Sequence, residues 1–293
     1  MEFQNYSDER YPALCDFLTE LNRTERQHIN WNWARLEWMI EHPEFDRTTR
    51  SSIGLWTDGG RIVGAAVYDM YFGEAFCGVL PAYRRLYPEV LDYAWRALKD
   101  EAGLGIAIED RSTEEQTAAL AAGFVPAEQT ETVMTAELSG TLPAGLPEGV
   151  TLYEPDPVRD AEAVQWLFWQ GFGHGDDRAR FEQEEKIVPQ TRPHFRRNLS
   201  LAAAAPDGEL AAYSCLWFRE GTDYAYVEPV CTVPHYRKRG LAKALLYEAM
   251  NRAAALGAKK AYVISDMDFY AKLGFRKEFH YTFYWKKDSE NKD

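Results

Sequence analysis

Hydrophobic and polar positions recur along the chain with two periods, which predict strands and helices in turn. Strand-like alternation occurs at 149–155 and across 200–218, where a Pro-Asp-Gly turn indicates a hairpin. Between them, apolar residues at 157–172 have helical spacing. Ala and Leu dominate 240–257, which predicts a helix that ends at Gly257. This order of elements predicts a mixed α/β fold.

The two halves of the chain resemble each other segment by segment. Three pairs of similar segments lie 149–153 residues apart, namely 58–69 with 206–217, 80–85 with 233–238, and 120–124 with 271–275. Gly and Pro are frequent between the two copies, where apolar periodicity is absent. We therefore predict an N-terminal domain at 1–140, a linker at 141–150 and a second domain at 151–293.

Composition and charge place the chain among ordinary globular proteins. Of its 293 residues, 46% are apolar and 27% are charged, and no apolar run is long enough to cross a membrane. The net charge of −13 would repel nucleic acid and anionic membrane surfaces, so we expect neither as a partner. The first 140 residues account for −12 of this charge, which favours a cationic substrate. The N-terminus has no signal-peptide pattern, so we expect a cytoplasmic protein.

The four cysteines show neither the spacing of a metal site nor that of a dithiol redox motif. Cys15, Cys77, Cys215 and Cys231 form no C-x-x-C pair and have no histidines at ligand spacing. We expect free, buried thiols and no metal site.

The residues with the clearest chemical meaning lie at a predicted strand-to-helix junction. Val233-Pro234 ends the strand, and Arg237-x-x-Gly240-x-Ala242 opens the helix. Small residues let backbone N–H groups approach an anion, and the helix N-terminus and basic side chains add positive charge. This pattern indicates a phosphate-binding loop, and the alternative is a solvated basic helix start.

At this junction the chain resembles the GNAT superfamily of acyl-CoA-dependent N-acetyltransferases, whose Q/R-x-x-G-x-G/A signature binds the cofactor pyrophosphate. FYAKLGF at 269–275 resembles the family's late helix, in which a tyrosine protonates the departing thiolate. That tyrosine is Tyr270 here, and its alternative interpretation is a packed core residue. The resemblance implies two tandem GNAT-like domains, each with a central, mostly antiparallel twisted sheet flanked by helices, and acetyl-CoA as cosubstrate. The cofactor-binding residues that it implies are Cys231, Val233, Arg237, Lys238, Arg239, Gly240, Leu241 and Ala242.

The first half resembles this family in the order of its segments, but it lacks the residues that would bind the cofactor. Alignment of the two halves places Tyr87 and Glu89 at the two small residues of the phosphate-binding loop, and Ala119 at the late tyrosine. A ring would block a pyrophosphate and a carboxylate would repel it. We therefore expect the N-terminal domain to be a degenerate, non-catalytic copy.

Glu228 lies on the predicted strand that leads to the phosphate-binding loop. In the GNAT family, a glutamate on this strand often acts as general base, because an alkylammonium must lose a proton before it attacks the thioester. Two alternatives remain for Glu228. Strand alternation could direct its side chain away from the site, and Pro229 could simply mark a bulge.

The resemblance implies an enzyme that transfers acetyl from acetyl-CoA to a primary amine of a small, cationic molecule, for example an aminoglycoside antibiotic. The alternatives are acetylation of a protein lysine or N-terminus, and a non-catalytic acyl-CoA sensor. We expect a monomer or a homodimer.

Overall fold

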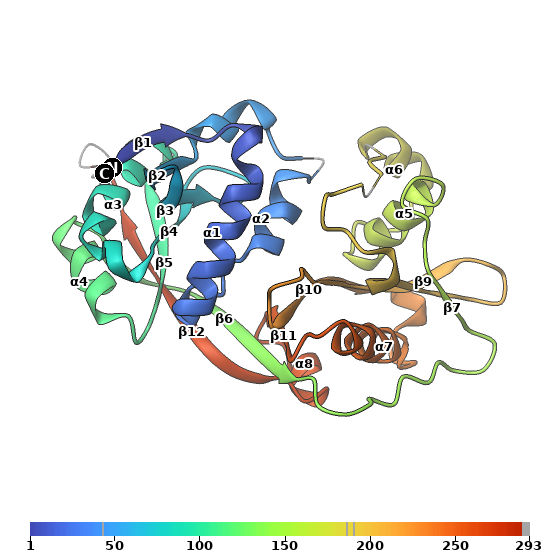
Figure 1. The fold of residues 1–293 in the computed structure, drawn as a ribbon. Coiled ribbons are helices and arrows are strands. Elements are labelled where there is room, and N and C mark those ends of the chain that lie inside the picture. The colour runs from blue at the N-terminus through green and yellow to red at the C-terminus, as the bar shows by residue number, and fades with distance from the viewer. Residues whose placement is uncertain (43, 186, 190, 289–293) are drawn as a thin grey trace. The chain divides into compact units, whose positions relative to one another are not determined.

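The computed structural model describes residues 1–42, 44–185, 187–189 and 191–288, and the chain divides into two compact units (Figure 1). Unit 1 comprises Met1–Val133, Ile264–Asp266 and the chain from Lys277 onward. Unit 2 comprises Met134–Val263 and Met267–Arg276. No helix among the described residues is long and apolar enough to cross a membrane.

Unit 1 has a sheet with the strand order β1-β2-β3-β4-β5-β12-β6. Every strand pair with a described register is antiparallel except β4 with β5. Its strands are β1 (Glu2–Asn5), β2 (Gly54–Asp58), β3 (Arg61–Tyr68), β4 (Glu74–Val79), β5 (Leu104–Glu109), the first part of β6 (Val125–Glu137) and β12 (Arg276–Lys286). Its helices are α1 (Tyr11–Thr24), α2 (Trp33–Ile40), α3 (Tyr87–Ala97) and α4 (Thr113–Ala121), with 3-10 turns η1 (Asp8–Arg10), η2 (Arg26–His28), η3 (Arg47–Ser52) and η4 (Pro81–Leu86).

Unit 2 repeats this plan with the strand order β6-β11-β10-β9-β8-β7, in which β10 and β11 are parallel. Its further strands are β7 (Thr151–Tyr153), β8 (Ser200–Ala204), β9 (Leu210–Trp217), β10 (Tyr224–Thr232) and β11 (Lys260–Ile264). Its helices are α5 (Ala161–Gly171), α6 (Arg178–Glu184), α7 (Leu241–Ala255) and α8 (Asp268–Lys272), with 3-10 turns η5 (Arg197–Leu199) and η6 (Pro234–Tyr236). The predicted mixed α/β fold with mostly antiparallel sheets is confirmed, as are the predicted hairpin between β8 and β9 and the predicted helix α7.

In both units the two central parallel strands pair only at their beginning. In unit 2 the register of β10 with β11 runs from Tyr224↔Lys260 to Tyr226↔Tyr262. In unit 1 the register of β4 with β5 covers two pairs and ends at Ala75↔Ile106. Each sheet therefore opens toward the carboxyl ends of these two strands, where their backbone groups are not paired with each other.

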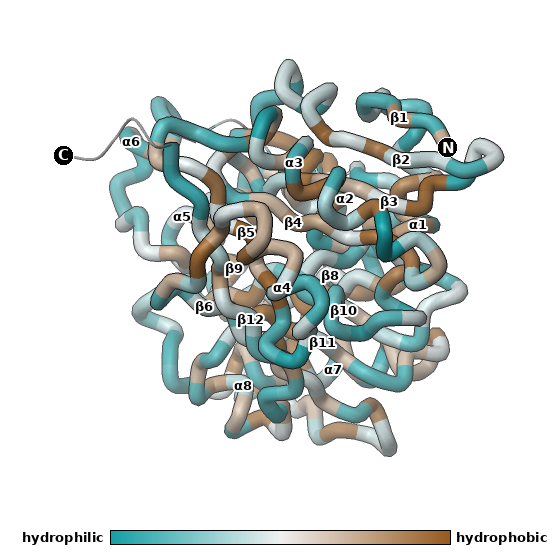
Figure 2. Tube along the Cα trace, turned by 90° about the vertical axis from the view of Figure 1, so that its left-hand side faces the viewer, coloured by the Kyte–Doolittle hydropathy of each residue, from teal (hydrophilic) through white to brown (hydrophobic). Residues whose placement is uncertain are grey.

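The core of unit 2 lies between its sheet and α7. Apolar side chains of this helix, such as Leu245 and Met250, pack against Leu216 and Val263 of the strands. Figure 2 shows the same pattern along the trace, with hydrophobic colouring on strands such as β9 and hydrophilic colouring on outer segments such as α6. These buried faces hold the carboxyl end of β10 and the amino end of α7 in fixed positions within the unit.

The compact units follow the sequence repeat only in part. The predicted linker forms no helix or strand, but it belongs to unit 2, where Leu142 exchanges hydrogen bonds with the Asn251 side chain at 2.8 and 2.9 Å. Strand β6 begins in unit 1 and ends in unit 2. Strand β12, which belongs to the predicted second domain in sequence, pairs with β5 in unit 1 from Tyr281↔Glu109 to Lys286↔Leu104.

All four cysteines are free and buried, as predicted. Cys231 lies opposite Tyr213 in the register of β10 with β9, so it does not face Cys215.

Candidate active site

The predicted phosphate-binding loop connects β10 to α7 in unit 2. Lys238 and Gly240 both have left-handed backbone conformations, with φ of 61° and 82°. Gly240 is the N-cap of α7 and has no side chain that could cap the helix. The N–H of Ala244 donates to the carbonyl of Gly240 at 3.0 Å, which is the first backbone hydrogen bond of the helix. The N–H groups of Leu241 and Ala242 therefore lie at an uncapped helix start, which favours an anion. A Cβ on Gly240 would meet no atom within 4 Å, so the space in front of this backbone is open.

The exposed side chain of Arg237 ties this loop to neighbouring backbone. Its Nε donates to Thr232 O at 3.1 Å, and its NH2 donates to Gly171 O, at the end of α5, at 2.9 Å. Arg239 donates to His235 O at 3.0 Å. These two side chains hold the loop in shape, and Lys238 and Gly240 are exposed beside the helix start.

The edge of β10 that faces the opening is formed by residues other than those predicted. Val233 donates its N–H to Ala211 O of β9 at 3.0 Å, so this group is already used within the sheet. Successive residues of an antiparallel strand direct their backbone groups to opposite sides, so Cys231 also faces β9, whereas Val230 and Thr232 face away from it. The backbone groups of Val230 and Thr232 are therefore the ones that face the opening, and the roles of Cys231 and Val233 as backbone partners of the cofactor stay predictions.

Glu228 lies at an irregularity of β10. The register with β9 shifts between Val227 and Val230, so Glu228 and Pro229 form a bulge, as one of the alternatives held. The carbonyl of Glu228 accepts a hydrogen bond from Trp217 Nε1 at 2.7 Å, which fixes the bulge on the neighbouring strand. The side chain of Glu228 is partly buried.

Tyr270 lies on α8, in the same unit as Glu228. Its ring is 8% exposed and packs edge to face against Phe269 and Phe275, with ring centroids 5.0 and 5.6 Å apart. Burial raises the pKa of Tyr270 well above its usual value, and the negative charge of Glu228 raises it further. The structure therefore brings the two predicted catalytic side chains within electrostatic reach of each other, with Tyr270 protonated at neutral pH.

The corresponding helix start of unit 1, at α3, has different side chains. Tyr87, at the position of Gly240, is buried and begins α3. Glu89 accepts a hydrogen bond from Trp56 Nε1 at 2.7 Å, so its carboxylate is fixed on β2 and does not extend from the helix start. The bulk of Tyr87, more than the charge of Glu89, distinguishes this helix start from that of α7.

Comparison with known proteins gives the same fold for the chain and a family match for part of its second half. Residues 161–275 match the model of the Acetyltransferase (GNAT) family. No curated protein sequence is similar enough to the chain to count as a match.

Three solved structures resemble nearly the whole chain. A GCN5-related N-acetyltransferase from Sphaerobacter thermophilus is 17% identical, with 97% of this chain and 95% of that chain covered and a TM-score of 0.59. A tandem GNAT protein from the clavulanic acid biosynthesis pathway is 17% identical, with 97% of each chain covered and a TM-score of 0.57. An acetyltransferase from the GNAT family of Colwellia psychrerythraea is 14% identical, with 98% and 100% covered and a TM-score of 0.57. The chain has the tandem GNAT fold, and its second half contains a GNAT acetyltransferase domain.

Proposed function

We propose that unit 2 transfers an acetyl group from acetyl-CoA to a primary amine of a small cationic molecule. The observation that supports this most directly is the loop between β10 and α7. There, two left-handed residues and an uncapped helix start adjoin an unpaired strand edge. A pyrophosphate fits the helix start, and an extended pantetheine arm with two amides fits the strand edge.

Acetyl-CoA supplies an activated thioester, and this chain's own residues bind, orient and move protons. The N–H groups of Leu241 and Ala242 and the Lys238 side chain hold the pyrophosphate. The backbone of Val230 and Thr232 aligns the arm. A strand amide polarises the thioester carbonyl, as in an oxyanion hole.

Two side chains handle the protons in this proposal. Glu228 takes a proton from the ammonium form of the acceptor, which otherwise has no lone pair for attack. Tyr270, whose raised pKa keeps it protonated, donates its proton to the departing sulfur. The negative charge of Glu228 raises the pKa of Tyr270. When Glu228 takes up a proton, this charge is lost, so Tyr270 gives its proton to the sulfur more easily.

The preference for a cationic acceptor rests on charge. The first 140 residues have a net charge of −12, whereas the remaining 153 residues have −1. A field of this sign raises the local concentration of cations and repels anions. Polyamines and aminoglycosides are amines of the corresponding charge.

The test measures release of the CoA thiol from acetyl-CoA in the presence of spermidine, an aminoglycoside, a neutral amine and a lysine peptide. We expect release with the cationic small molecules, and a loss of that release in Tyr270→Phe. Faster release with the peptide would favour a protein acceptor. Absence of release with every amine, together with tight CoA binding, would favour a sensor and overturn the proposal.

A further inference from the structure

Unit 1 contains a cluster of three ionisable side chains that the proposed acetyl transfer does not use. Glu25 follows the end of α1, His28 ends the η2 turn, and Glu115 lies in the first turn of α4. Glu25 and His28 are buried, and the Glu115 side chain is 17% exposed. Sequence spacing joins only the first two of these residues, so the fold has to bring α4 to them.

The donor atoms of these side chains are spaced like the ligands of a small metal ion. His28 Nε2 lies 3.0 Å from Glu115 Oε1 and 3.7 Å from Glu25 Oε2, and all three donor atoms lie within 4.8 Å of one another. Ligands at about 2.05 Å from a tetrahedral Zn²⁺ are separated by about 3.3 Å, and the two distances to His28 bracket this value.

The His28 ring lies between the two carboxylates. Its side chain is 11% exposed, and its Nε2 is ion-paired with both Glu115 and Glu25. A nitrogen and two carboxylate oxygens within 4.8 Å of one another can share either a proton or a metal ion.

We propose that Glu25, His28 and Glu115 form a divalent transition-metal site in unit 1, with Zn²⁺ as the ion of choice. One imidazole and two carboxylates suit Zn²⁺ better than Mg²⁺ or Ca²⁺, which prefer oxygen ligands alone. No metal site was expected here, because the cysteines of the chain form no C-x-x-C pair and have no histidines at ligand spacing.

Two of the three proposed ligands reach a cavity, which gives room for a further ligand. Glu25 and Glu115 line a cavity of about 540 Å³ at the carboxyl ends of β4 and β5, together with Tyr87 and Glu109. Three protein ligands leave a fourth tetrahedral position, which a water from this cavity fills.

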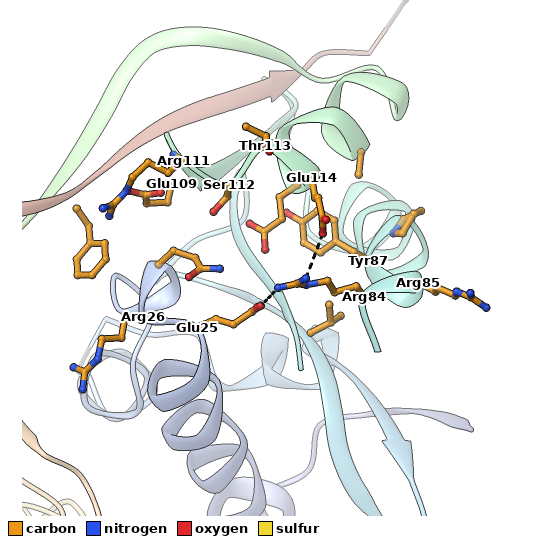
Figure 3. A pocket seen from close by; sticks show the side chains of 16 residues that line it. Glu25, Arg26, Arg84, Arg85, Tyr87, Glu109, Arg111, Ser112, Thr113 and Glu114 are labelled. Carbon is orange, nitrogen blue, oxygen red and sulfur yellow. Dashed lines mark hydrogen bonds and ion pairs between the residues drawn. The ribbon is translucent and has the colours of Figure 1, made fainter. Parts of the chain in front are cut away.

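Arg84 forms a hydrogen bond with one of the proposed ligands, Glu25. Figure 3 shows its guanidinium joined to Glu25 and to Glu114. Glu25 bonds Arg84 through Oε1 and directs Oε2 toward His28, so the two oxygens have separate partners. A bound carboxylate is commonly held by such an outer hydrogen bond.

The ion has to compete with a proton. Burial lowers and the two carboxylates raise the pKa of His28, to about 10 overall. Zn²⁺ therefore displaces a proton from Nε2 as it binds.

The test uses the full chain after chelator treatment and gel filtration. Zn²⁺ is added, unbound ion is removed, and the metal retained per chain is measured; Co²⁺ is then titrated in a parallel sample and followed by absorption. We expect one Zn²⁺ per chain, and visible Co²⁺ bands of a tetrahedral site without the near-ultraviolet band of a thiolate ligand. Retention of no Zn²⁺, or a thiolate band, would overturn the assignment.

Two variants and a matched control locate the site. His28→Gln and Glu115→Gln should each weaken Zn²⁺ binding by more than about 100-fold. Glu114→Gln removes the same charge from the adjacent position of α4, where the side chain is 76% exposed, and should retain the metal. Equal retention by all three variants would overturn the proposal. Circular dichroism establishes that each variant is folded, and the Co²⁺ spectrum of the unmodified protein tests the donor set without any substitution.

Discussion

Gly240→Tyr places a ring at the start of α7, where the proposed pyrophosphate site has open space. Gly240 has φ of 82° and no atom within 4 Å of a Cβ built on it. The side chain therefore meets no protein atom close to the backbone, but it occupies the space that a ligand would fill. The same residue type stands at the equivalent position of unit 1, as Tyr87.

The magnitude follows from the groups that the ring would cover. Two N–H groups, those of Leu241 and Ala242, lie at this helix start, and a hydrogen bond to a charged partner contributes about 1.5–3 kcal/mol. Loss of both costs at least about 3 kcal/mol, which corresponds to a weakening of CoA binding by more than about 100-fold. The left-handed backbone adds a cost of about 1–2 kcal/mol to folding, which leaves a folded domain.

A matched control separates the loss of CoA binding from the cost to folding. Gly257 lies just beyond the other end of α7, with φ of 110° and no atom within 4 Å of a Cβ, so Gly257→Tyr imposes a similar backbone penalty far along the helix. Calorimetric titration with CoA and thermal melting of both variants give affinity and stability. We expect similar losses of melting temperature and a loss of CoA affinity only in Gly240→Tyr. Normal CoA binding by folded Gly240→Tyr would refute the placement of the pyrophosphate.

Further expectations concern the proton transfers, the number of sites and the loop itself. Tyr270→Phe should lower kcat by about 10²–10⁴-fold and change the acetyl-CoA affinity little; an unchanged kcat in steady-state assays would remove its role as acid. Because the Tyr270 pKa is raised, activity should not decline through its titration below about pH 10, which a pH profile measures. Glu228→Gln should flatten the acidic limb of kcat/KM and recover activity where the amine is already neutral. Calorimetry should find one CoA per chain, since two would mean that unit 1 retains a site despite Tyr87. Arg237→Gln should lower stability by roughly 1–2 kcal/mol in thermal melting, because two carbonyl partners are lost.

The sequence predicted the parts of the site that depend on local backbone geometry. An Arg-x-x-Gly-x-Ala pattern at a strand-to-helix junction requires a left-handed glycine and a helix start, and Gly240 and α7 supply both. Tyr270 was found through a short pattern that likewise forms one helix.

The sequence could not predict which side of β10 faces the opening. The orientation of the backbone groups alternates along β10, and it restarts after the bulge at Glu228 and Pro229. The hydrogen bond from Val233 N–H to Ala211 O shows which residues face β9. The cluster in unit 1 was missed for a similar reason, because Glu115 joins Glu25 and His28 only when α4 has packed.

The position of β12 also determines when unit 1 can become complete during synthesis. A ribosome makes the chain from its N-terminus, and N-terminal domains usually fold first. Here β5 lacks its neighbour β12 until residues 276–286 have been made, by which time all of unit 2 has been translated. The nascent first half therefore waits with an open sheet edge, which is a template for unwanted pairing. For the same reason, a gene truncated at the linker encodes neither unit in full.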